Sequence, residues 1–280
     1  METFKRRSAE KSVDKPVENP SQLKNQKSYK GWWISLLFFI LILFLWEVSA
    51  VLKIIPPLFF PAPTIIFSTL VKMMIRGDLA VNLGTTLFRV LLGFLFGGAS
   101  GMIIGLAMGW SGKMRSVFDP LIAACHPIPK IAILPLIMII FGIGDTSKII
   151  VVALSALFPM LINSMSGVQQ INPVHFEVAE NYGAGALKIF KKVVIPGSLP
   201  MIMAGARVSL NLALLITIAV ELVSANVGLG AMVWLAWETF RIEELYASIA
   251  VASFLGIFFN VLIKKITRIL IPWRAEIERE

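Results

Sequence analysis

Long apolar runs alternate with short polar stretches along this chain, and the runs have the length of membrane-crossing helices. An α-helix needs about 20 predominantly apolar residues to cross the hydrocarbon core of a bilayer. The sequence predicts such helices at residues 32–52, 85–108, 118–143, 148–168, 201–223 and 246–269. We therefore expect an all-α, polytopic membrane protein with about six transmembrane helices. The predicted transmembrane domain covers residues 31–270, and a short polar tail follows at 271–280.

The N-terminal segment, residues 1–30, is polar and basic and shows no apolar periodicity, which is typical of a disordered tail. The apolar run after it raises the alternative of a secretory signal peptide, because Val48-Ser49-Ala50 resembles a small-residue cleavage site. The apolar core of a signal peptide measures about 7–15 residues, and this run is near the length that spans a membrane. The run therefore predicts a retained first helix.

Glycines and prolines inside the predicted spans indicate how the helices pack. A glycine at every fourth position predicts a smooth seam that serves either a neighbouring helix or a partner chain, at 93, 97, 101, 105 and 109. In the third span, Pro127, Pro129 and Pro135 predict a kinked or broken segment that is buried among other helices or lines a cavity. After the first span, four prolines forbid a continuing helix, and Thr64 to Met74 predicts a short amphipathic helix at the membrane interface.

Composition and charge exclude a water-soluble domain and set an orientation. Apolar residues make up 57% of the chain and charged residues 15%, whereas a soluble domain carries about 25% charged residues. Basic residues gather in the N-terminal tail, at 113–115, at 188–192 and at 264–268. By the positive-inside rule, this asymmetry predicts that both termini and the loop 169–200 face the cytoplasm. Nucleic-acid binding is disfavoured, because no aromatic residues are interleaved with the basic clusters to stack on bases.

Catalytic and metal-binding chemistry has little support in the sequence. One cysteine and two histidines stand in no metal-ligand spacing, so we expect no metal site. Gly112-Lys113 is followed by Met114, so the phosphate loop of an ATPase is absent and we expect neither a catalytic residue nor a bound cofactor. The string at 142–145 matches the GxGD of intramembrane aspartyl proteases, which need a second carboxylate nearby. The nearest candidate, Asp119, would lie about 39 Å from Asp145 along a helix.

The loop at 169–200 carries the clearest local signals. Asn172 caps a helix and Pro173 suits its first turn, so the sequence predicts a helix that runs to about Asn181 and stops at Gly183. A second short helix is expected from Ala184 to Lys192, ending before Pro196. The product is a compact helix–turn–helix, which is either a docking surface or an ordinary interfacial loop.

This loop resembles the EAA loop of binding-protein-dependent permeases. The family pattern reads EAA, three residues, G, nine residues and then I-x-L-P. The chain fits every spacing and departs from the pattern only at Val178, Val193 and Ile195, all of them small apolar replacements. The resemblance assigns the role of an ATPase-coupling loop to Glu177, Val178, Ala179, Gly183, Val193, Ile195 and Pro196.

The resemblance extends over about residues 45–270 and is closest to the branch associated with nitrate, sulfonate and taurine import. It includes Pro61-Ala62-Pro63, the run PIPKIAILPL and Glu221 before Gly228-Leu229-Gly230. It implies a type I importer permease of MetI-like architecture in a bacterial cytoplasmic (inner) membrane. It further implies a second permease copy in a homodimer, two cytoplasmic ATP-binding-cassette ATPase subunits that hold ATP and Mg, and an extracytoplasmic binding protein that delivers a small anionic solute.

The rival function is a secondary transporter or channel that is not coupled to ATP. Coupled carriers place ionisable residues at mid-membrane, and here most charges fall toward the span ends. Candidate residues of the translocation path are Asn163, Ser209, Asn211, Thr217 and Glu221. Such polar groups serve equally well as hydrogen-bonding contacts between helices. Glu221 is expected to pair with Arg207 or Arg241, or to hold the loop that follows it.

Overall fold

The computed structural model describes the backbone of residues 20–274 and the side chains of residues 33–273. Every regular element in this part of the chain is helical, which confirms the all-α expectation. The elements are α2 (Pro20–Val51), α3 (Pro63–Arg76), α4 (Asp78–Trp110), α5 (Gly112–Cys125), η1 (Lys130–Ile133), α6 (Leu134–Phe141), α7 (Asp145–Gln169), α8 (Pro173–Asn181), α9 (Ala186–Ile189), η2 (Phe190–Val194), α10 (Ile195–Ser224), α11 (Leu229–Glu238), α12 (Ile242–Leu270) and η3 (Pro272–Arg274).

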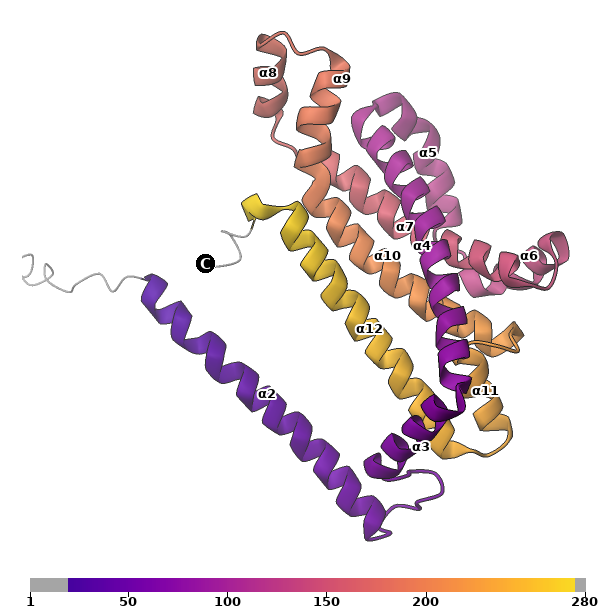
Figure 1. Cartoon of the computed structure of the whole chain (residues 1–280). Helices are drawn as coiled ribbons and strands as arrows, with labels where there is room; N and C mark the ends of the chain where they lie inside the picture. The colour runs from indigo at the N-terminus through magenta and orange to yellow at the C-terminus, as the bar shows by residue number, and fades with distance from the viewer. Residues whose placement is uncertain (1–19, 275–280) are drawn as a thin grey trace, which may run out of the picture.

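Five helices of the described chain are long and apolar enough to cross a membrane, or six if the bent pair of α5 with η1 and α6 counts as one span. Figure 1 shows α8 and α9 at one end of the bundle, called the α8 end below, and α3 and α11 at the other, called the α11 end. The helix α2 runs toward the α11 end, and α12 returns toward the α8 end. The described chain therefore begins and finishes on the α8 side, as an even number of crossings requires.

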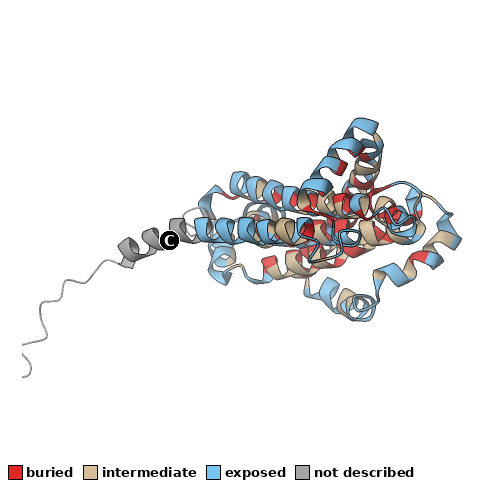
Figure 2. Cartoon of the chain, turned by 90° about the horizontal axis from the view of Figure 1, so that it is seen from below, coloured by how far each residue is buried: buried red, intermediate tan, exposed pale blue. Residues whose placement is uncertain are grey.

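The core of the bundle lies where α4, α7 and α10 pack together, and Figure 2 shows the buried residues along its centre. The predicted glycine seam of α4 packs on α7 of the same chain. A Cβ at Gly97 would collide with the backbone carbonyl of Ala153, and one at Gly101 with that of Leu157. Close backbone approach of this kind is what a glycine seam permits between membrane helices. The seam therefore serves a neighbouring helix.

The third span is broken, as its prolines predict. The helices α5 and α6 meet at an angle of 85° around the segment that contains Pro127 and Pro129. The chain's own helices do not provide the expected burial of this segment, because Pro127, Pro129 and Pro135 are exposed, and its alternative role of lining a cavity stays a prediction. The bend directs α6 away from the bundle (Figure 1), so few neighbours of its own chain remain to cover the pair.

Two predicted boundaries are wrong. The first helix begins at Pro20, so residues 20–30 of the expected disordered tail are helical, and residues 1–19 lie outside the described part. Once a long span has formed, each further residue adds a hydrogen bond without a new nucleation cost. The second helix of the loop does not end before Pro196 but continues from Ala186 to Ser224. A π-helical turn at η2 directly precedes α10, and Pro196 lies in the first turn of α10, where a proline is tolerated. The helix therefore continues through the proline.

The first span stands apart from the rest of the bundle. Only 6% of the apolar stretch of α2 is buried, against 50% for α7. Large apolar side chains along it are exposed, among them Trp33, Leu37 and Phe38. Lipid or another polypeptide must cover such a surface.

Candidate functional site

The helix α8 forms as the sequence predicts, with both of its ends fixed by local hydrogen bonds. The Asn172 side chain accepts a hydrogen bond from the Val174 N–H at 3.0 Å. At the other end Gly183 adopts φ +71°, its N–H donates to the Glu180 carbonyl at 2.8 Å, and the Ala184 N–H donates to the Ala179 carbonyl at 3.0 Å. This pair of bonds around a left-handed glycine is a Schellman motif. The turn therefore fixes the angle between α8 and α9.

The predicted coupling residues fall on α8, on the turn at Gly183, on η2 and on the start of α10. Glu177 is exposed on α8, and Ala179 is half-buried. Val193 and Pro196 are half-buried at η2 and the start of α10. The outward face of the loop carries apolar side chains that no residue of the described part covers, with Val178 48%, Tyr182 86% and Leu187 68% exposed. An exposed apolar group of this kind on an ordered helix pair is typical of a protein-binding surface.

An aromatic contact that sequence reasoning missed anchors this loop to the membrane bundle. Trp110, the last residue of α4, lies with its ring 6.2 Å from that of Phe176 on α8. Its ring is 5.9 Å from that of Phe190, in an edge-on arrangement. Ring pairs at these separations attract one another beyond their buried area. The only signal in the sequence was a tryptophan at the end of an apolar span.

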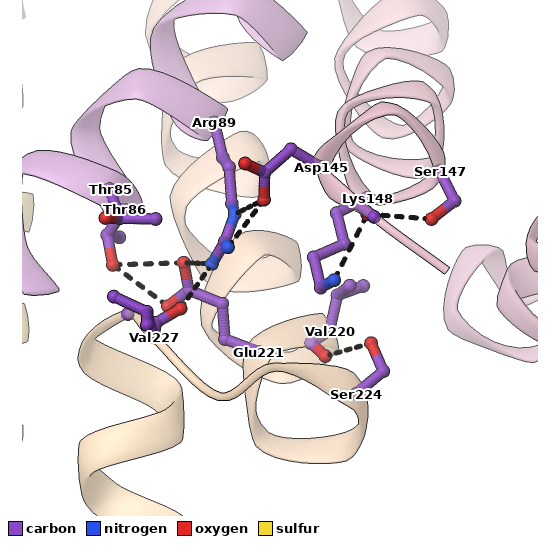
Figure 3. A network of polar contacts seen from close by, with 12 residues as sticks. Thr85, Thr86, Arg89, Asp145, Ser147, Lys148, Val220, Glu221, Ser224 and Val227 are labelled. Atoms are coloured by element: carbon purple, nitrogen blue, oxygen red, sulfur yellow. Dashed lines mark hydrogen bonds and ion pairs between the residues drawn. The ribbon is translucent and has the colours of Figure 1, made fainter. Parts of the chain in front are cut away.

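At the α11 end, Glu221 is fully buried in a cluster of polar contacts (Figure 3). Its carboxylate accepts from Arg89 Nη1 at 2.7 Å, and not from Arg207 or Arg241 as expected. Arg241 pairs with Glu244 instead, at 2.9 Å. The Arg89–Glu221 pair was not predicted, because Arg89 lies 132 residues from Glu221 in another span. A buried charge in a membrane needs a partner, so the presence of Glu221 inside a span indicated that a basic partner exists without indicating which one.

The expectation that Glu221 holds the following loop is confirmed. Its carboxylate accepts from the Gly230 N–H at 3.0 Å, at the start of α11. Thr86 donates to the same carboxylate at 2.9 Å and accepts from the Leu229 N–H at 2.8 Å. Arg89 Nη1 also donates to the Val227 carbonyl at 2.7 Å. The loop between α10 and α11 is therefore tied to α4 and to the end of α10.

Arg89 also holds the start of α7 through Asp145. Its Nε and Nη2 donate to one carboxylate oxygen of Asp145, at 2.8 Å and 2.6 Å. Asp119 lies in α5 and pairs with Arg115 at 3.2 Å. Each aspartate thus has an arginine partner, and the paired aspartates of a protease are not formed. Among the described residues, no cluster of potential metal ligands is present.

The other candidate path residues are dispersed. Thr217 is fully buried, and its hydroxyl donates to the Ala213 carbonyl of its own helix at 2.7 Å. Ser209 is buried, and its hydroxyl has no partner in the described part of the chain. Asn163 donates to the Pro159 carbonyl at 2.8 Å. Asn211 forms a reciprocal amide pair with Asn260 of α12, at 3.3 Å.

Comparison with known proteins identifies the family. Residues 97–276 match the family described as "Binding-protein-dependent transport system inner membrane component". The taurine transport system permease protein of Escherichia coli (strain K12) is 32% identical over 242 residues, which is 85% of this chain and 88% of that protein. A putative aliphatic sulfonates transport permease protein of Bacillus subtilis (strain 168) is 29% identical over 272 residues, 96% of this chain and 99% of that protein.

The fold also matches a solved structure. The inward-facing MetNI methionine ABC transporter aligns with a TM-score of 0.62 and 17% identity, over 70% of this chain and 97% of the matched chain. This similarity confirms the expected MetI-like architecture. The chain therefore belongs to the binding-protein-dependent transport system inner membrane components, as a multi-pass permease subunit of an ATP-binding-cassette importer.

Proposed function

We propose that this permease carries a small sulfonate-type anion into the cytoplasm and that the loop 169–200 receives the ATPase subunits. The family membership implies an ATPase and a binding protein as partners. The solute class is supported by two relatives, which are named for taurine and for aliphatic sulfonates and align over 85% and 96% of this chain. We further propose a homodimer of this chain with two ATPase subunits, and both termini in the cytoplasm.

The observation that carries the docking proposal is the geometry of α8. Two caps hold this short helix rigidly, and Trp110 anchors it to the bundle, yet Tyr182 and Leu187 project away from the chain. Aromatic side chains on such a surface are frequent anchors of protein interfaces. ATP and Mg are then bound by the partner subunits, and this chain performs no catalysis of its own.

The test is a glycine series at position 183 in the complete transporter. A Cβ at Gly183 would meet no atom within 4 Å, so only the φ of +71° disfavours a side chain. Gly183→Val forces a β-branched residue into that conformation at a cost of about 1–2 kcal/mol, which the turn relieves by reorienting α8. We expect normal amounts of the variant in the membrane, reduced copurification of the ATPase and loss of most uptake of radiolabelled taurine.

Gly183→Asn is the matched control, because asparagine tolerates the left-handed conformation better than other side chains. It should retain both the ATPase and uptake. Wild-type uptake by Gly183→Val would show that the turn does not couple the subunits. A wild-type complex that hydrolyses ATP but imports neither taurine nor another alkanesulfonate would refute the solute class and leave the docking role intact.

A further inference from the structure

Arg207 is a charged residue inside a membrane span that has no partner among the residues whose side chains the structure describes. It lies in α10 and is exposed. In the part of the chain that the structure describes, its guanidinium makes no hydrogen bond and no ion pair. An unpaired arginine is costly in hydrocarbon, and such residues face a bundle interior or a water-filled cavity.

Contacts with neighbouring helices place Arg207 well inside the membrane bundle. Gly205 packs directly against Asn163 of α7, which lies about 9 Å before the end of that helix at 1.5 Å per residue. Asn211 pairs with Asn260 of α12, about 15 Å before the end of α12. Arg207 lies between these two levels.

The acidic residues of the membrane helices lie elsewhere. In the described chain, the carboxylates of α4, α7, α10 and α12 are all at the α11 end: Asp78, Asp145, Glu221, Glu243 and Glu244. Asp119 of α5 already pairs with Arg115. In a second copy of the chain, the carboxylates of the membrane helices would lie at the same end. Among the described residues, the carboxylates of these membrane helices therefore do not pair with Arg207, which leaves its guanidinium open to an anionic ligand.

The neighbours of Arg207 form a surface suited to an anion. Asn211 lies one helical turn along α10, so its Cβ is about 5–6 Å from that of Arg207. Its amide partner Asn260 lies on α12, and Lys264 follows Asn260 by one turn and is exposed. Arginine, lysine and amide N–H groups are all hydrogen-bond donors to an oxyanion. A planar guanidinium also offers two parallel donors to a sulfonate or phosphate.

We propose that Arg207, with Asn211 beside it, binds the anionic group of the solute on the translocation path, in the half of the membrane nearer the α8 end. The inference rests on the proposed function, since it takes the solute to be a sulfonate-type anion. A lipid phosphate has the same oxyanion chemistry and is the other source of such a ligand. An aqueous path and a lipid-facing surface differ in their access to water-soluble reagents, and that difference provides the test.

The experiment uses the complete transporter in proteoliposomes, with Cys125→Ser to remove the native thiol and Asn211→Cys as the reporter. Two methanethiosulfonate reagents of similar size are compared, one with an ethylsulfonate group and one with an ethyltrimethylammonium group. The ratio of their rates cancels the intrinsic reactivity of the thiol. With Arg207 present, we expect the ratio of the anionic to the cationic reaction rate to be roughly tenfold higher than without it, as one charge about 6 Å away in a hydrated site predicts.

Arg207→Gln should lower this ratio roughly tenfold, and Arg207→Lys should preserve most of it. Arg268→Gln removes an exposed charge at the end of α12 and serves as the control, with no change in the ratio expected. Ala204→Cys, exposed on the preceding turn, repeats the measurement in case Asn211→Cys does not assemble. If Arg207→Gln leaves the ratio of the two reaction rates unchanged, the proposal is overturned. Reporters that react with neither reagent also overturn it, and assign Arg207 to lipid phosphate.

Retention of the ATPase is measured in the same preparations and separates this proposal from the proposed function. If the ATPase copurifies and alkanesulfonates are imported but Arg207 has no influence on the ratio, only the role of Arg207 is refuted. If the wild-type chain retains no ATPase, the docking role fails, whatever the reagents report. Uptake of taurine by Arg207→Gln gives a second readout, and we expect a loss of at least tenfold.

Discussion

The guanidinium of Arg89 donates hydrogen bonds to three acceptors, and each acceptor belongs to a different part of the chain. Its contacts reach Asp145 at the start of α7, Glu221 near the end of α10 and the Val227 carbonyl in the loop after it. Glu221 is fully buried, whereas the Asp145 side chain is 50% exposed. The arginine thus neutralises a carboxylate that solvent does not reach.

Removal of Arg89 should destabilise the protein severely. Arg89→Leu leaves Glu221 buried without its counter-ion, and loss of one member of a buried pair costs about 3–5 kcal/mol. The measurement is the thermal unfolding midpoint of the purified chain in detergent. Arg76→Leu is the control, because its pair with Glu244 at 3.1 Å is partly solvated and such pairs contribute about 0–1 kcal/mol. Equal midpoints for the two variants would contradict a stabilising role for the cluster.

Contacts between residues close in the sequence were predictable, and contacts between distant residues were not. Asn172, Pro173 and Gly183 act within one helix, so their spacing alone predicted α8 and its turn. Glu221 was singled out, but the expected partners, Arg207 and Arg241, were wrong, because the observed partner Arg89 lies far away in the sequence. The identity of a long-range pair depends on which helices are neighbours, and apolar periodicity does not contain that information.

The seam between α4 and α7 is the tightest contact between two elements. A Cβ at Gly97 would overlap the Ala153 carbonyl, which is backbone and cannot rotate aside. We expect Gly97→Ala to lower the unfolding free energy by about 1–3 kcal/mol, as overpacked cores do. Gly84→Ala is the matched control on the same helix, where a Cβ meets no atom within 4 Å. It should be neutral or stabilising by up to about 1 kcal/mol.

Thermal unfolding of the two variants in the same detergent gives the comparison. A Gly97→Ala protein as stable as Gly84→Ala would show that α4 and α7 are not in backbone contact. The element scale is where sequence reasoning was most successful, since every predicted span and the break at Pro127 and Pro129 are found. The continuity of α9 with α10 was missed because a proline marks a helix boundary and the first turn of a new helix equally well.

For the whole molecule, the positive-inside rule predicts that the α8 end lies in the cytoplasm. Cysteines are introduced one at a time in a Cys125→Ser background, at the exposed positions Lys188 near α9 and Lys72 on α3. We expect an impermeant thiol reagent added to intact cells to label Lys72→Cys and not Lys188→Cys. Permeabilised cells should show labelling at both positions. The reverse pattern in intact cells would invert the orientation.

The arrangement of whole chains was the part that the sequence predicted least. Lipid and a partner permease both select apolar side chains, so the exposed faces of α2 and α5 look the same in a sequence whichever covers them. The resemblance to a permease family supplied the expectation of a dimer, and the physical pattern did not. The same ambiguity explains why the sequence did not show whether helices of this chain or of a partner would cover the third span.

The helix from Ala186 to Ser224 has 39 residues and a length of about 58 Å, with a π-helical turn at η2 and Pro200 inside α10. Its short arm before the turn is α9, and its long arm reaches Glu221. A tilt of about 10° at the turn would swing the Glu221 end by roughly 7 Å. Because Arg89 binds Glu221, a small displacement of α9 would become a larger displacement of the Arg89–Glu221 contact at the α11 end of the bundle.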